Sequence, residues 1–511
     1  MFIFRQICKD NPFKGHYLGT RFKKEITMRK RFEQNLALGQ TPISDVYIPE
    51  NCKDAEVALL KALQKIFTTP EYNQKIFNIL DKHISKGKKR TGRRGMDLWH
   101  IFILSQLRLC LNVDYDRLHY LANNDTLLRQ IMGIPTGFGV TPKEFGYQTI
   151  YDNVNLLNDE MVKEFNEVIV QMGHKVFKKK ETAPLHLKTD SFVVLSNVHF
   201  PTDYNLLWDS GRKCLDVMKF LIRKNQAIKG WRKLKDWTRR LKSQMRDLGK
   251  SCSGGGKNKQ DRVLASAKIY IETARILSKK IKTQLETIPI TDEEILGKLI
   301  SLEYFHEMLN KHIELVDRRL IQGETIPHQE KLFSIFETYT QWITKGKTNP
   351  GVELGKNVMI TTDQYHLIID YRVLESETDS QAVISLGDSI LLKYKLIHIW
   401  SFDKGFFSTL NKDLLGLFVP HLIMPKKGKL SGLEKEKESE KMFKKYRMKH
   451  SAVESNINEL EDKGLDRCPD RGYMHFKRYV GLGVCAYNLH RIGKELIKQH
   501  KAEIQELREA A

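Results

Sequence analysis

The chain has 511 residues, enough for about three domains of roughly 150 residues, and 41% of them are hydrophobic. This composition excludes a wholly disordered chain and a miniature scaffold. Lys and Arg number 85 against 62 Asp and Glu, and the resulting net charge of +23 favours a polyanionic partner.

The seven cysteines are scattered, with no C-x-x-C pair and no neighbouring pair of histidines. This pattern argues against a disulfide framework and against a zinc site, and it fits a reducing cytoplasm. No apolar stretch approaches the roughly 18 residues of a membrane span. We therefore expect a cytoplasmic protein whose positive charge serves nucleic acid and not a membrane.

Residues 28–95 are interpreted as an N-terminal arm that ends in the basic run KGKKRTGRRG. Six cations in nine positions predict a flexible linker that contacts phosphates, with a solvated loop that contacts nothing as the alternative. The expected DNA contacts in this run are Lys88, Lys89, Arg90, Arg93 and Arg94.

Residues 96–180 show a helical pattern, broken into short segments by Asn, Asp and Gly. The clearest helix follows Asn158, a predicted N-cap. A compact set of short helices on a basic chain favours a helix-turn-helix-like DNA-binding region, although short helices alone are a weak signal. The apolar stripe of the clearest helix consists of Met161, Phe165, Val168, Ile169, Met172 and Val176.

At residue 185 the apolar period changes from 3.6 to 2, which predicts a strand or strand pair in LHLKTDSFVVLSNVHF. Further strands are expected at 357–374 and 396–403, followed by the short run 421–425. The sequence thus predicts a strand-containing core over 185–204 and 355–500, interrupted by a helical insertion.

The insertion, residues 205–350, includes a predicted capping box of Thr291 and Glu294. Within it, residues 211–260 hold 16 Lys or Arg against three Asp, a net of 16 − 3 = +13. Trp231 and Trp237 lie in this basic stretch, either stacking on nucleic acid or anchoring the core. The expected DNA contacts here are Arg232, Lys233, Arg239 and Arg240.

Phosphodiester chemistry is commonly run by two divalent cations that carboxylates hold on rigid elements. Asp190 interrupts an apolar strand, Asp403 ends another, and Glu454 lies in a short helix that Gly464 closes. On residue type alone, a turn or cap position for the two aspartates and a solvated helix position for Glu454 are favoured over a metal-binding role. Rival acids are Asp363, Asp370, Glu459 and Glu461.

Three strings carry a family resemblance: KTDSFVVLSNVHFPTDYNLLWDSGRKCLDV, SFDKGFFS, and HSAVESNINELEDKG with its continuation to LHRIG. They resemble the catalytic blocks of bacterial insertion-sequence transposases of the DDE type, most closely the ISNCY-like group. The third block is long and specific, and the second is short. The resemblance implies an α/β fold with an RNase H-like core and the catalytic, metal-binding triad Asp190, Asp403 and Glu454, separated by 213 and 51 residues. It begins at about Met28, so residues 1–27 are interpreted as a possible upstream extension.

One departure concerns the surroundings of the glutamate. Many relatives follow Y-x2-R-x3-E-x6-K, whereas here Arg447 lies seven positions before Glu454, His450 four before it and Glu461 seven after it. Arg447, His450 and Lys463 are nonetheless expected to contact DNA near the site, with an ordinary polar helix position as the alternative for His450.

The resemblance implies a bacterial, nucleoid-associated enzyme that binds the terminal inverted repeats of its element in double-stranded DNA. Cleavage and 3′-OH strand transfer would use two Mg²⁺ ions, for which Mn²⁺ can substitute. Pairing two ends implies a homodimer or a higher oligomer on DNA. The alternatives are a DNA-binding protein of transposon descent that no longer cuts, acting as a repressor or architectural factor, and a nuclease of the same fold that does not join strands.

Overall fold

The computed structural model describes residues 31–32, 34, 36, 40–85, 95–135, 143–225, 228–344 and 351–510. The chain forms two compact units, a helical unit over Val198–Thr340 and a mixed unit that includes Glu25–Asn197 and Gln341–Ala511. The possible extension 1–27 lies outside the described residues. So do the linker cations Lys88, Lys89, Arg90, Arg93 and Arg94.

The first helices of the mixed unit pack around its last one. α2 (Ala55–Thr68), α4 (Leu98–Cys110) and α8 (Asp159–Val176) contact α18 (Tyr473–Ala510), which is buried over most of Phe476–Gly493. Asn158 caps α8 as predicted, because its side chain accepts from the backbone N–H of Met161. All six residues of the predicted stripe on α8 are buried. The other helices of this region are η1 (Ile43–Asp45), α3 (Pro70–Leu80), η2 (Asp81–Ser85), α5 (Tyr115–Asn124), α6 (Thr126–Ile131) and α7 (Tyr147–Val154).

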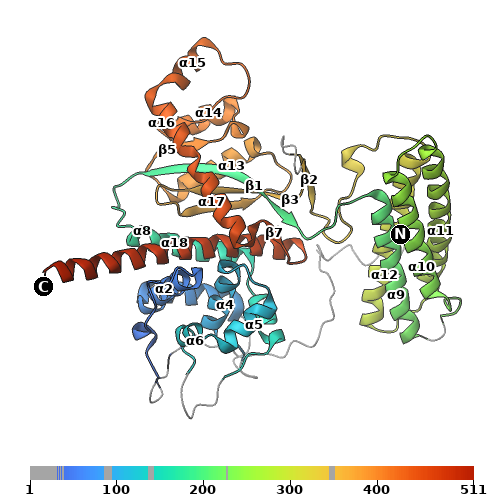
Figure 1. The fold of residues 1–511 in the computed structure, drawn as a ribbon, viewed down its shortest axis with the longest axis horizontal. Coiled ribbons are helices and arrows are strands. Elements are labelled where there is room, and N and C mark those ends of the chain that lie inside the picture. Colours follow the sequence, from blue (N-terminus) through green and yellow to red (C-terminus); the bar gives the residue numbers. More distant parts are fainter. Residues whose placement is uncertain are drawn as a thin grey trace. The chain divides into compact units, whose positions relative to one another are not determined.

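A mixed sheet forms the centre of this unit, and the fold is mixed α/β (Figure 1). β1 (Leu185–Ser196) pairs antiparallel with β3 (Val352–Thr362) on one edge and parallel with β5 (Ile397–Phe402) on the other. β6 (His421–Ile423) continues the sheet parallel to β5. Along the free edge of β3 run β2 (Gln341–Thr344) and β4 (Ile368–Val373), and β7 (Arg467–Cys468) pairs with the end of β1.

Helices cover both faces of the sheet. α13 (Asp379–Lys393) packs Val383, Leu386 and Ile390 against Leu187 and Trp400 on one face. Toward the other face lie α16 (Lys441–His450), which contacts β5, and α17 (Ala452–Leu460), which contacts β1. The remaining helices here are η4 (Lys404–Phe406), α14 (Thr409–Gly416), α15 (Gly432–Ser439) and η5 (Glu461–Leu465).

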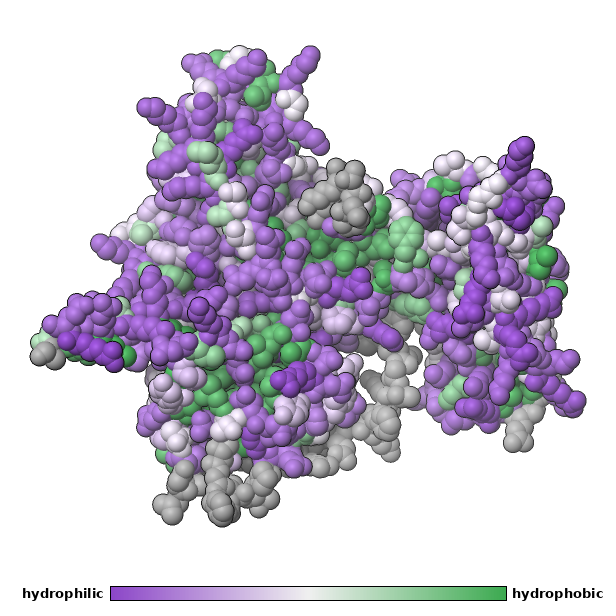
Figure 2. Space-filling view, viewed as in Figure 1, coloured by the Kyte–Doolittle hydropathy of each residue, from purple (hydrophilic) through white to green (hydrophobic). Residues whose placement is uncertain are grey.

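The helical unit consists of α9 (Asp203–Lys224), α10 (Leu234–Ser253), α11 (Lys259–Thr287) and α12 (Glu293–Leu320), followed by η3 (His328–Glu330). Each of the four long helices contacts the next, and α12 also contacts α9, so they enclose one apolar core. Hydrophilic side chains dominate the face of this unit seen in Figure 2. In the described part of the chain, no helix is both long enough and apolar enough to cross a membrane.

Three local predictions differ from the structure. The stretch 357–374 is a hairpin of two strands, β3 and β4, because Asp363 starts a tight turn between them. Residues 341–344, predicted within the insertion, form β2 of the sheet. Asp292, and not Thr291, caps α12, because its side chain accepts from the backbone N–H of Ile295.

Candidate active site

Asp190 lies on β1 at the centre of the sheet, where its neighbour on β3 is Ile360. Side chains alternate along a strand, so Lys188 and Asp190 share one face, and Thr189 and Ser191 share the other. The α13 face is identified by Thr189, whose hydroxyl accepts from Trp400 Nε1 at 2.8 Å within the core. Asp190 therefore faces the side of α16 and α17.

Asp403 comes directly after β5. β5 runs parallel to β1, and Phe402 lies beside Thr189. The residues that follow them, Asp403 and Asp190, therefore also lie side by side. Asp403 is exposed and precedes the short helix η4.

Glu454 is in the first turn of α17. The helix buries Val453, Asn456, Ile457 and Leu460, and Glu454, beside this buried face, is exposed. α17 packs against β1, and this packing holds Glu454 near the strand that carries Asp190.

Burial and the neighbouring acids both act on Asp190. Burial raises the pKa of Asp190 from 3.8 to about 6, against the lowering effect of the Ser191 N–H, which donates to its carboxylate at 2.8 Å. The negative charges of Asp403, Asp379 and Glu454 raise the pKa of Asp190 further. The charges of both other predicted acids thus act on Asp190, together with the charge of a fourth acid, Asp379.

Asp379 is the fourth acid, and the sequence pattern did not predict it. It follows the capping residue Thr378 at the start of α13, and the pattern there is that of an ordinary helix N-terminus. Its carboxylate accepts from Ser191 Oγ at 2.9 Å and from Asn357 Nδ2 at 3.3 Å. It lies on the α13 face, behind Asp190, and no local sequence signal connects it to β1.

The donor set suits a hard divalent cation. It offers carboxylate oxygens, and their mutual repulsion is what a cation relieves. Among the residues that the structure describes, no three His, Cys, Asp or Glu side chains already form a metal-binding group. The carboxylates are close enough to shift the pKa of Asp190 but are not arranged as a finished ligand shell.

No family model, curated protein or solved structure matches this chain. The resemblance to DDE transposases therefore remains a prediction from the residues.

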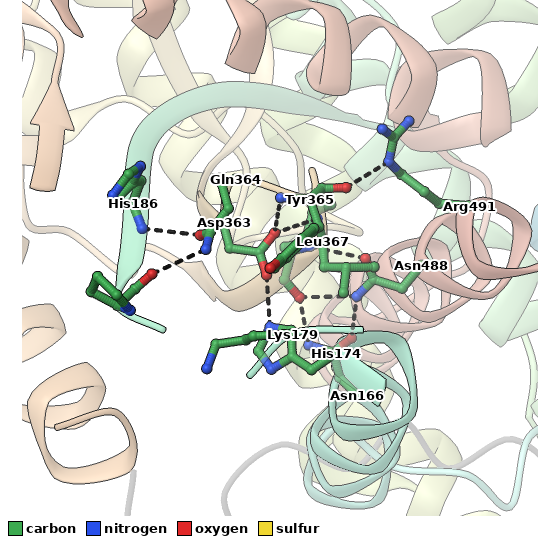
Figure 3. Close-up of polar contacts among 12 residues, drawn as sticks. Asn166, His174, Lys179, His186, Asp363, Gln364, Tyr365, Leu367, Asn488 and Arg491 are labelled. Atoms are coloured by element: carbon green, nitrogen blue, oxygen red, sulfur yellow. Dashed lines mark hydrogen bonds and ion pairs between the residues drawn. The ribbon is translucent and has the colours of Figure 1, made fainter. Parts of the chain in front are cut away.

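Asp363 and Asp370, two of the rival acids, have structural partners. Asp363 is fully buried in the β3–β4 turn, where one oxygen accepts from the N–H groups of Tyr365 and Leu367 and the other lies 2.7 Å from His174 Nε2 (Figure 3). Asp370 on β4 pairs with Arg372 at 3.3 Å. Asp363 holds the turn against α8, so neither acid is free to join the site.

The rival acids beyond Glu454 are also placed. Glu459 lies 3.1 Å from His490 Nδ1 and 3.9 Å from Lys494 Nζ, so it binds α17 to α18. Glu461 is half-buried in η5, past the end of α17.

His450 lies beside the site but is not a cation. Its Nδ1 is 3.0 Å from Ser401 Oγ, and the Ser401 hydroxyl itself donates to the Leu187 carbonyl. Burial lowers the pKa of His450 to about 4, opposed by the charge of Asp403 and assisted by that of Lys188. A neutral imidazole offers no charge to a phosphate, and this weakens the predicted DNA contact.

Arg447 and Lys463 differ in their exposure. Arg447 is exposed on α16 and pairs with Glu438 at 3.3 Å, so it can exchange this partner for a phosphate. Lys463 is buried, and its ammonium donates to the Cys110 carbonyl at 3.4 Å. The prediction that Lys463 contacts DNA conflicts with this position, because the turn through Gly464 directs the side chain into the core.

The basic stretch 211–260 lies on the surface of the helical unit. Arg232, Lys233, Arg239 and Arg240 are all exposed, and of these only Arg239 has an acidic partner in the described part of the chain, Asp236 at 3.5 Å. Trp231 is 4% exposed and Trp237 packs partly against the same core, so the structure favours the anchoring alternative for both rings.

Proposed function

We propose that this chain is a DNA transposase with an RNase H-like catalytic core. The observation that carries the proposal is that Asp403 lies beside Asp190 on adjacent parallel strands, and that the charge of Glu454, on a helix packed against β1, acts on Asp190. These residues are 264 positions apart from first to last, 454 − 190, so their meeting is a property of the fold. Two further observations support it: a mixed sheet with helices on both faces, and a helical unit between β1 and β2 in the chain.

In this proposal the three carboxylates would hold divalent cations, Mg²⁺ with Mn²⁺ as a substitute, and these would supply activation of the attacking oxygen and stabilisation of the leaving one. The protein's own contribution is placement. β1 and β5 fix the two aspartates side by side, and the buried residues of α17 hold the helix against β1. Water attacks in the cleavage step and the freed 3′-OH in the joining step, with no covalent protein intermediate.

DNA binding is assigned to the exposed Lys and Arg side chains of the helical unit. The exposed cations of the helical unit have few acidic partners, and this suits contact with the phosphate backbone, which is independent of base sequence. The N-terminal helices are proposed to read the terminal repeats, and joining two ends requires at least two copies on DNA. A chain that handles bacterial DNA in this way acts in the cytoplasm.

The test is incubation with duplexes that carry the DNA ends flanking the coding sequence, in Mg²⁺, scoring nicking and strand transfer. We expect Asp190→Ala, Asp403→Ala and Glu454→Ala each to lower both rates at least ~100-fold while duplex binding persists. Asp388→Ala, at an exposed acid of α13 outside the site, is the matched control and should keep the wild-type rates.

The outcome distinguishes the alternatives. Transfer at the wild-type rate by any of the three variants would remove that residue from the site. Binding by the wild type without nicking under any divalent ion would favour the DNA-binding protein, and nicking without joining would favour the nuclease.

A further inference from the structure

Lys188 is a lysine in the interior of the sheet. It lies on β1 two positions before Asp190, on the same face, beside Ser401 of β5 and Thr362 of β3. Its side chain is half-buried, although lysine is usually exposed. Two positions along a strand span about 6.5 Å, so its long side chain can reach the surroundings of Asp190.

The Lys188 ammonium makes no hydrogen bond and no ion pair within the part of the chain that the structure describes. The acid whose charge favours it is Asp363, but both oxygens of that carboxylate are already bound by His174, Tyr365 and Leu367 (Figure 3). Asp363 thus favours the charge of Lys188 only from beyond ion-pair distance, and Lys188 has no bonded anionic partner among the described residues.

The other charged neighbour is itself a cation. The charge of Lys449, on α16, disfavours the ammonium form of Lys188, and the charge of Lys188 in turn acts on His186, on β1, and on His450. A half-buried cation beside another cation destabilises the folded protein unless an anion joins it. The arrangement therefore leaves a place for an anion on the face of the sheet that carries the carboxylates.

We propose that Lys188 binds the DNA phosphate that is to be attacked, next to Asp190 and Asp403. The proposal rests on the proposed function and adds a residue to it. A phosphate is favoured over a carboxylate partner because the acids of the site are already in excess around Asp190, and because none of them forms an ion pair with Lys188 among the described residues. The ammonium thus holds the phosphodiester against the carboxylate cluster, which would otherwise repel it.

The test compares Lys188→Met with Lys356→Met. Lys356, on the neighbouring strand β3, is 4% exposed, but its ammonium donates to the Glu375 carbonyl. If Lys188 is an anion-binding residue, Lys188→Met unfolds at the wild-type temperature or higher in the absence of DNA, because an unpaired charge has been removed. Lys356→Met should unfold several degrees lower, because a bonded group has been removed.

The activity readout is the cleavage rate at saturating DNA. We expect Lys188→Met to cleave at least tenfold more slowly than the wild type with little change in KM, and Lys188→Arg to recover part of the rate. Cleavage by Lys188→Met within twofold of the wild type would overturn the proposal. So would a melting temperature lowered as much as that of Lys356→Met, because it would assign Lys188 a structural role.

A second measurement tests Lys188 even if the proposed cleavage activity is absent. If the wild type cleaves no DNA, duplex binding is measured against salt for the wild type and Lys188→Met. A log–log slope smaller by about 0.9 in the variant supports a phosphate contact at Lys188, and an unchanged slope overturns it.

Discussion

Asp190 is an acid on a central strand, half-buried and surrounded by like charges, and both conditions raise its pKa. A raised acid pKa means that the folded protein holds the proton more tightly than the unfolded chain does. The contribution of Asp190 to the free energy of unfolding therefore falls as pH rises from 3.8 to about 6, and this contribution is constant above that range. In the absence of a cation, the ionised Asp190 therefore lowers the free energy of unfolding at neutral pH.

Asp190→Asn is consequently expected to be more stable than the wild type at pH 7.5 in metal-free buffer, by roughly 1–3 kcal/mol. The difference should shrink as pH falls and nearly vanish below about pH 3, where Asp190 is protonated in both states. Denaturant unfolding at the two pH values measures it.

Asp363→Asn is the control for this pH experiment. Asp363 is the fully buried acid with bonded oxygens, so its replacement should destabilise the protein at pH 7.5. A wild type more stable than Asp190→Asn at pH 7.5 would mean that the like charges around Asp190 are compensated.

At the scale of elements, the position of Glu454 depends on how α17 ends. The chain leaves the helix through η5, where Gly464 has a φ of +92°, and a Cβ there would lie 2.5 Å from Asn112 Oδ1 and 2.7 Å from the Tyr479 hydroxyl. Both a left-handed conformation and close packing thus require glycine. The same turn buries Lys463 and joins α17 to the helices around α18.

Gly464→Ala should lower the free energy of unfolding by more than about 1 kcal/mol and slow cleavage, because α17 must shift. Gly428→Ala is the matched control: its φ is +95°, but no atom lies within 4 Å of the added Cβ. It should show only the smaller conformational cost. Equal decreases of stability in the two variants would show that the packing around Gly464 relaxes freely.

The sequence predicted elements well where a single period or a local cap determines them. The buried stripe of α8, its cap Asn158 and the strand β1 are examples. The turn at Asp363 was missed, because its bonds to Leu367 and His174 depend on the folded hairpin and on α8.

In the candidate site too, residues with a local sequence signal could be predicted, and residues that depend on tertiary neighbours could not. Acids in apolar strands could be recognised locally, and the register of β1 and β5 places Asp403 beside Asp190, whose pKa the charge of Glu454 also raises. Asp379 and Lys188 could not be recognised, because one looks like a helix N-terminus and the other like an ordinary strand lysine until their neighbours are known. The burial of Lys463 could not be predicted either, because burial is a tertiary property.

At the scale of the whole molecule, the most basic stretch of the chain and the candidate carboxylates lie in different units. The stretch 211–260, with its net of 16 − 3 = +13, lies in the helical unit, whereas the carboxylates lie in the mixed unit. The helical unit has an apolar core of its own, including Tyr270, Leu277 and Leu302. This separation implies that binding of the DNA backbone and cleavage can be measured apart.

We expect residues 198–340, expressed alone, to fold as a helical domain and to bind duplex DNA of any sequence without cleaving it, because the domain carries exposed cations but none of the triad. Circular dichroism checks the folding, and binding titrations at several salt concentrations check the mode of binding. Replacing Arg232, Lys233, Arg239 and Arg240 by Gln should flatten the log–log salt dependence by about 0.9 for each phosphate that the domain no longer neutralises. Since all four side chains are exposed, the replacement should leave the melting temperature nearly unchanged. An unchanged slope in a folded variant would show that this surface is only solvated, and the basic helix α16 beside Glu454 would then be the next surface to test for DNA binding.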